Sequence, residues 1–153
     1  MKSGRVWRTT GFACLLLLLF ATPIWAVLGQ PVSSVQADRA RMRGKSHAVA
    51  EEGYSIQTIT TAYGEVVSEY VSPAGMVFGV SWKGPAMPKL SQLLGSYFSQ
   101  LNQPSRANVR RRRSVTVRTQ QVIIQSGGHP RGFYGRAYVP SLVPAHISPS
   151  VVH

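Results

Sequence analysis

The sequence is poor in the residues on which most enzymes and metal sites depend. It has one cysteine, Cys14, and five acidic residues against 17 lysines and arginines. Without a second cysteine the chain cannot form an internal disulfide or a cysteine-rich metal site. It also lacks an HExxH motif, a His-x-His pair, a Gly-x-Ser-x-Gly elbow and a phosphate-binding glycine loop. These absences disfavour metal-dependent hydrolases, serine hydrolases and nucleotide-binding enzymes, and we expect no cofactor and no metal ion.

The N-terminal residues have the three parts of a secretory signal peptide. A basic start precedes an uninterrupted apolar run over Phe12–Phe20, and Ala26 supplies a small residue at the expected cleavage site. The basic residues of this start are Lys2, Arg5 and Arg8. We expect residues 1–26 to enter the membrane only during export and to be removed, leaving a periplasmic or secreted protein without cysteine. The alternative is an uncleaved inner-membrane anchor, but a spanning helix needs about 20 apolar residues.

The remaining chain, 27–153, is strongly basic, with 14 lysines and arginines against five acidic residues. One basic cluster spans Arg39–Lys45, and a second consists of Arg110, Arg111, Arg112 and Arg113. The second cluster could contact an anionic surface, or it could be a solvated loop, because its neighbours are polar. Nucleic-acid-binding modules pair basic grooves with stacking aromatic side chains, and none is interleaved here. We therefore expect no nucleic-acid partner.

Hydrophobic periodicity predicts two helices and several short strands. A short helix is expected over Val32–Met42, ended by Gly44. A longer amphipathic helix is expected over Lys89–Leu101, whose leucines and aromatic residues recur at helical spacing. Segments rich in β-branched residues or with alternating apolar residues predict strands. They are Tyr54–Thr61, Glu65–Val71, Met76–Trp82, Ser114–Gln125 and Gly132–Val139.

These elements indicate a single α+β domain over 27–140. We expect an antiparallel sheet, made of a β-meander and a C-terminal hairpin, covered by one amphipathic helix and accompanied by a short N-terminal helix. Residues 102–113 have the composition of a polar, arginine-rich linker inside the domain. The tail, 141–153, is expected to be extended or disordered because prolines recur in and next to it.

The stretch SGGHPRGFYGRAY, Ser126–Tyr138, admits two interpretations. Its glycines fit a tight turn between two antiparallel strands, which needs no ligand. A turn does not account for His129, Arg131 and Arg136, which could instead line a ligand-binding loop. Isolated polar residues in a loop are more often simply solvated.

Three blocks of the sequence resemble a known family. They are VSSVQADRARM, a long block that includes EYVSPAGMVFGVSWKGP (Glu69–Pro85), and GGHPRGFYGRAYVPSLVP, which includes Gly128–Pro140. Together they resemble the domain of unknown function 2844 family, which comprises small exported bacterial proteins, mostly from proteobacteria. The resemblance covers most of the chain after the signal peptide, but not the arginine run. It implies export and a common fold, and it implies no activity.

We interpret the protein as an exported, non-catalytic binding or accessory module. Strand alternation places Tyr134, Arg136 and Tyr138 on one face of the last strand, and aromatic and arginine side chains are typical of interaction surfaces. The candidate binding residues are His129, Arg131, Tyr134, Arg136, Tyr138 and Trp82. The partner would be another envelope protein or an anionic surface. The alternatives are envelope association through the basic clusters and, less favoured, a hydrolase in which His129 has an acid or a serine within hydrogen-bond reach.

Overall fold

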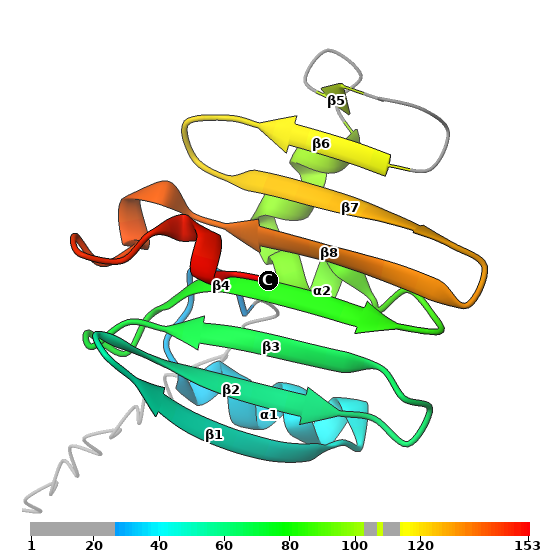
Figure 1. The fold of residues 1–153 in the computed structure, drawn as a ribbon, viewed down its shortest axis with the longest axis horizontal. Helices are drawn as coiled ribbons and strands as arrows, with labels where there is room; N and C mark the ends of the chain where they lie inside the picture. The colour runs from blue at the N-terminus through cyan, green and yellow to red at the C-terminus, as the bar shows by residue number, and fades with distance from the viewer. Residues whose placement is uncertain (1–26, 103–106, 109–113) are drawn as a thin grey trace, which may run out of the picture.

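The computed structural model describes residues 27–102, 107–108 and 114–153. The expected signal peptide over 1–26 and the cluster Arg110–Arg113 lie outside these residues. The described strands form one antiparallel sheet in the order β1-β2-β3-β4-β8-β7-β6-β5 (Figure 1). They are β1 (Lys45–Glu51), β2 (Tyr54–Thr60), β3 (Val66–Val71), β4 (Val77–Gly84), β5 (Ala107–Asn108), β6 (Ser114–Arg118), β7 (Ile123–His129) and β8 (Gly132–Tyr138).

Helical segments lie on both faces of the sheet. Helix α1 (Ser33–Met42) lies behind the β1–β3 side in Figure 1, and α2 (Leu90–Leu94), continued by the 3-10 helix η1 (Gly95–Asn102), lies behind the other half. Two short 3-10 helices, η2 (Pro140–Leu142) and η3 (Pro149–Val151), bring the C-terminal residues onto the front face. We call this front face, opposite α1 and α2, the open face.

The expected fold class is wrong, because the molecule is mostly sheet and no single amphipathic helix covers the described strands. The segment expected as one helix over Lys89–Leu101 is α-helical only over Leu90–Leu94. Gly95 then adopts φ 52° and ψ −125°, which ends the α-helical hydrogen-bonding pattern, and a 3-10 helix follows. Its apolar side chains still reach the core, because a 3-10 helix also returns every third residue to one side.

The sheet also contains elements that the sequence pattern did not indicate. Strand β1 pairs with β2 over its full length, from Lys45 opposite Thr60 to Glu51 opposite Tyr54. The one strand expected over Ser114–Gln125 is interrupted by a turn between β6 and β7. In that turn the Oγ1 atom of Thr119 accepts hydrogen bonds from two backbone N–H groups, of which that of Val122 is the shorter at 3.0 Å.

The main core fills the space between the sheet and the helices. Val80, Ala137, Ile124 and Val117 lie opposite one another across β4, β8, β7 and β6, and all four are fully buried. Leu93 of α2 belongs to the same cluster. Burying each of the larger aliphatic side chains of this cluster contributes about 1.5–3 kcal/mol, so this face supplies most of the hydrophobic stabilisation.

The C-terminal residues are folded against the open face, although the sequence predicted an extended or disordered tail. Val152 is fully buried and forms a second cluster with Tyr70 and Phe78. The ring of Tyr54 lies 6.3 Å from that of Tyr70 and 6.1 Å from that of Phe78. The tail therefore covers one part of the open face and leaves the part over β6–β8 available.

Candidate functional site on the open face

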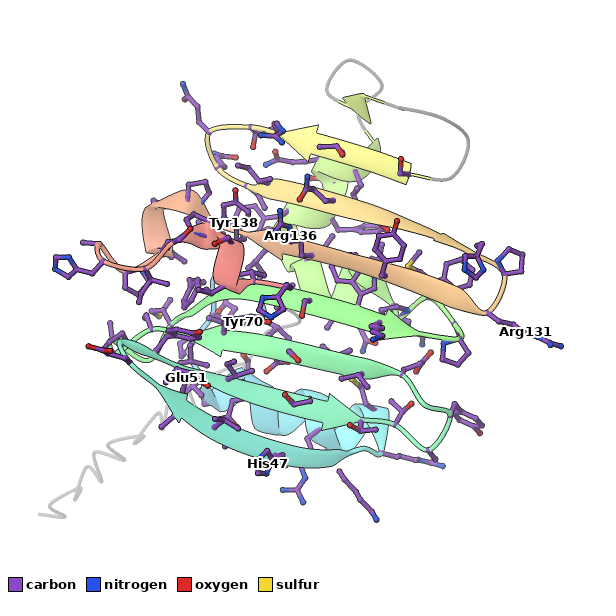
Figure 2. All side chains as sticks on the ribbon, viewed as in Figure 1. His47, Glu51, Tyr70, Arg131, Arg136 and Tyr138 are labelled. Carbon is purple, nitrogen blue, oxygen red and sulfur yellow. The ribbon has the colours of Figure 1, made fainter. Side chains whose placement is uncertain are left out.

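A row of polar side chains crosses the open face from one edge of the sheet towards the other. Antiparallel partners share a face, so the strand register aligns one residue from each of seven strands. This polar row consists of His47, Thr58, Ser68, Ser81, Arg136, Gln125 and Thr116. Figure 2 shows its two labelled members, His47 on the outer strand β1 and Arg136 near the middle of the sheet.

The middle of this row holds the backbone of the C-terminal residues. Ser81 donates a hydrogen bond of 2.9 Å from Oγ to the main-chain oxygen of His153. The hydroxyl group of Tyr70 donates to the same oxygen at 2.8 Å and accepts from the N–H of His153 at 3.2 Å. Arg136 donates from Nη1 to the carbonyl oxygen of Val152 at 3.0 Å. The open face thus already holds two consecutive residues of the tail, Val152 and His153, through their main-chain atoms.

A groove of ≈ 430 Å³ lies beside the end of this tail, over β8, β7 and β6. Its lining includes two cationic side chains, Lys83 and Arg136, and no acidic residue is among the described residues that line it. The guanidinium group of Arg136 is held in place by its Nε atom, which donates to Oε1 of Gln125 at 2.7 Å. Its Nη2 atom makes no hydrogen bond within the described part of the chain. The groove therefore presents two cationic side chains, and none of its described lining residues is an aspartate or a glutamate.

Glycine and tyrosine shape the groove. Tyr134 is 59% exposed and its ring lies over Gly127, where an added Cβ atom would sit 3.0 Å from the Tyr134 hydroxyl oxygen. Gly127 therefore lets the ring lie close to the sheet. An exposed tyrosine above a flat glycine surface offers a large contact area that is partly apolar and partly polar.

The structure separates the predicted binding residues into three places. Tyr134 and Arg136 line the groove, and Tyr138 lies on the same face but is packed against the C-terminal residues. The side chain of Trp82 is 2% exposed and belongs to the core on the opposite face, where its ring lies beside Gly135. Trp82 is also among the residues that line the groove, but its side chain contributes to the core beneath it rather than to an exposed surface.

His129 and Arg131 lie at the β7–β8 turn. The Nδ1 atom of His129 is 3.0 Å from the carbonyl oxygen of Pro130, and its ring lies over Gly132. Arg131 has φ 68° at the tip of the turn and extends away from the sheet in Figure 2. Neither residue lines the groove, and His129 has no serine or carboxylate partner among the described residues.

The sequence alone did not identify several of the residues that line the groove. Lys83, Gln125 and Thr116 are ordinary polar residues when each is considered alone. Only the strand register, together with the position of the tail, brings them next to Tyr134 and Arg136. A strict alternation count along every strand would have grouped some of them by face, but it would not have assigned partners between strands.

The described residues contain neither a metal-binding cluster nor a helix suited to spanning a membrane. No group of three or more His, Cys, Asp or Glu side chains there is arranged to hold a metal ion. Among the described helices, none has both the length and the apolar character needed to cross a membrane.

Fold and site together define a small protein built on one antiparallel sheet, with a basic groove on its open face. The chain matches the family model described as "Protein of unknown function (DUF2844)" over residues 25–152. It therefore belongs to the DUF2844 family, which confirms the resemblance seen in the sequence. No curated protein and no solved structure matches the chain.

Proposed function

We propose that the protein is an exported, non-catalytic binding module whose groove takes an acidic segment of a partner protein. The observation that carries this proposal is the pairing of Lys83 and Arg136 in a groove that no described acidic residue lines. Two cationic side chains in a concave, partly apolar site without aspartate or glutamate favour an anionic ligand. Tyr134 would pack against the aliphatic part of that ligand.

A polypeptide ligand is favoured over a small anion because the same face already binds the tail through hydrogen bonds to its main chain. Tyr70, Ser81 and Arg136 bind main-chain atoms of Val152 and His153, so this face offers side chains that recognise a polypeptide backbone. The groove begins where that segment ends, since His153 is part of its lining. A partner segment could therefore lie on the remaining part of the face in extended form.

Export is the second part of the proposal and depends on residues 1–26. A basic start, a short apolar run and Ala26 support cleavage in the cell envelope. Mass spectrometry of the protein from a periplasmic or culture-medium fraction should find Val27 as its first residue. Recovery of the intact N-terminus in the membrane fraction would instead favour the anchored alternative.

The groove can be tested by fluorescence anisotropy with a labelled oligoglutamate peptide and an oligolysine peptide of equal length. Lys83→Gln and Tyr134→Ala should each weaken oligoglutamate binding about fivefold or more, the range expected for contact residues. Lys89→Gln is the matched charge control, because Lys89 is exposed and immediately precedes α2 on the far side of the sheet. Tyr63→Ala is the matched aromatic control, since Tyr63 is 84% exposed.

If Lys83→Gln and Lys89→Gln weakened oligoglutamate binding equally, binding in the groove would be contradicted, because the peptide would be attracted by net charge alone. Binding of oligolysine as tightly as oligoglutamate would contradict the charge argument itself. A hydrolase that uses His129 gains no support from the geometry, since the imidazole is exposed and contacts its own turn.

A further inference from the structure

Strand β1 is an edge strand whose outer side is open. It pairs with β2 through all seven residues, and no described element pairs with its other side (Figure 1). Every residue of β1 is exposed. Edge strands present unpaired backbone N–H and C=O groups, which makes them templates for pairing with another strand.

The charges on this edge are arranged with opposite signs at its two ends. Arg43 and Lys45 lie at its start, and Glu51 and Glu52 lie at its end. All four are exposed. Two of the five acidic residues of the whole sequence are therefore placed at one end of a single edge strand.

We propose that two copies of this chain associate through their β1 strands, antiparallel and centred on Ala48. In this register Lys45 of each copy lies opposite Glu51 of the other, and His47 lies opposite Val49. Ser46 lies opposite Ala50, and Ala48 lies opposite its own equivalent. The basic end of each strand meets the acidic end of the other, twice, by symmetry.

The antiparallel register centred on Ala48 fits this edge better than other pairings of two copies do. A parallel pairing would put Lys45 against Lys45 and Glu51 against Glu51, which is unfavourable. A register centred on His47 would place Lys45 opposite Val49 and Glu51 opposite Arg43, which lies outside β1 in a left-handed conformation. A lysine on an edge strand normally discourages pairing with another strand, but in this register Lys45 lies opposite the carboxylate of Glu51 in the other copy. The large positive net charge of the chain opposes association, and the acidic residues at the edge offset it locally.

Sedimentation equilibrium over a dilution series tests the proposal with the full protein. We expect a reversible dimer. Lys45→Glu and Glu51→Lys should each weaken it about tenfold or more, since each converts two attractive contacts into two repulsive ones. The double variant Lys45→Glu/Glu51→Lys should restore dimerisation. Lys89→Glu, an equal charge change far from β1, should leave the dimer unchanged, and circular dichroism checks that each variant folds.

Cysteine cross-linking tests the register in a Cys14→Ser background. Ala48→Cys should form an intermolecular disulfide on oxidation, because directly opposed residues of antiparallel strands have Cα atoms within disulfide range. Ser46→Cys, on the same face of β1, should not, because the two cysteines would lie about 13 Å apart along the strands. A monomer at every concentration, failure of the charge swap, or equal cross-linking at both positions would overturn the proposal, whatever the groove binds.

Discussion

Val152 occupies the space that a side chain at Gly79 would need. A Cβ atom built on Gly79 would lie 2.6 Å from Cγ2 of Val152. Val152 is fully buried there, and its carbonyl oxygen accepts a hydrogen bond from Arg136. The absence of a side chain in the middle of β4 therefore allows the C-terminal residues to dock, and docking in turn defines one end of the groove.

Gly79→Ala should consequently release or distort the tail. We expect the free energy of unfolding to fall by about 1–3 kcal/mol, the usual cost of overpacking a filled site. Val152→Ala alone should cost a similar amount through lost burial. The double variant should cost less than the sum, because shortening Val152 removes the atoms that clash. Urea denaturation measures all three, and strictly additive losses would show that the two residues do not share this contact.

Tyr70 tests the polar part of the same docking site. Its hydroxyl group contacts both the N–H and the oxygen of His153, and the side chain is 2% exposed. Tyr70→Phe should lower the free energy of unfolding by about 0.5–1.5 kcal/mol for each hydrogen bond lost. It should also make the last residues more accessible to carboxypeptidase. Tyr63→Phe, at an exposed turn, is the control, and an equal effect of both variants would exclude a role for the hydroxyl group.

Much of the sheet could be predicted from local patterns. The strands β2, β3 and β4 lie within one or two residues of the segments expected from β-branched and alternating residues. The turn around Ser72–Gly75 closes as a hydrogen-bonded turn, with Gly75 N–H donating to Ser72 O at 2.8 Å. These elements depend on short-range information, which a single sequence contains.

Other parts depend on contacts that a local pattern cannot show. Strand β1 is exposed along its whole length, so it has no apolar stripe to reveal it. The leucine and aromatic spacing after Lys89 fits an α-helix and an α-helix continued as a 3-10 helix almost equally well, and the conformation of Gly95 decides between them. The groove combines residues from three strands and the tail, and only their register brings Lys83 near Arg136.

Two glycines beside the groove should respond differently to the same substitution. A Cβ atom on Gly135 would clash with Cζ2 of Trp82, which is 2% exposed and cannot move away. Gly135→Ala should therefore lower the free energy of unfolding by about 2 kcal/mol or more, as overpacking in a dense core does. Gly127→Ala meets the exposed end of Tyr134, which can rotate towards solvent, so its cost should stay below about 1 kcal/mol. Thermal or urea unfolding of both variants checks the difference, and equal losses would contradict it.

Tyr54, next to the β1–β2 turn, should make the stability of the protein depend on pH in the alkaline range. Burial, the charge of Glu51 and the neighbouring Tyr70 raise the pKa of Tyr54 above its usual 10.0, in that order of importance. A folded-state pKa above the unfolded value means that the native state holds the proton more tightly. The resulting stabilisation is complete below the unfolded pKa and is lost as the pH rises through the folded one. Above pH 10, the free energy of unfolding should therefore fall less steeply with pH in Tyr54→Phe than in the wild-type protein. Denaturation at stepped pH measures this difference.

Glu51→Gln separates the two main causes of this shift. Removing the carboxylate should lower the pKa of Tyr54 only in part, because burial of the phenol remains. Ultraviolet titration of tyrosinate should resolve the change when Glu51→Gln is compared with Glu52→Gln, its exposed neighbour in the turn. Glu51→Gln should also weaken the proposed β1 dimer. A pKa of Tyr54 that returns fully to its usual value in Glu51→Gln would show that charge, and not burial, dominates at this position.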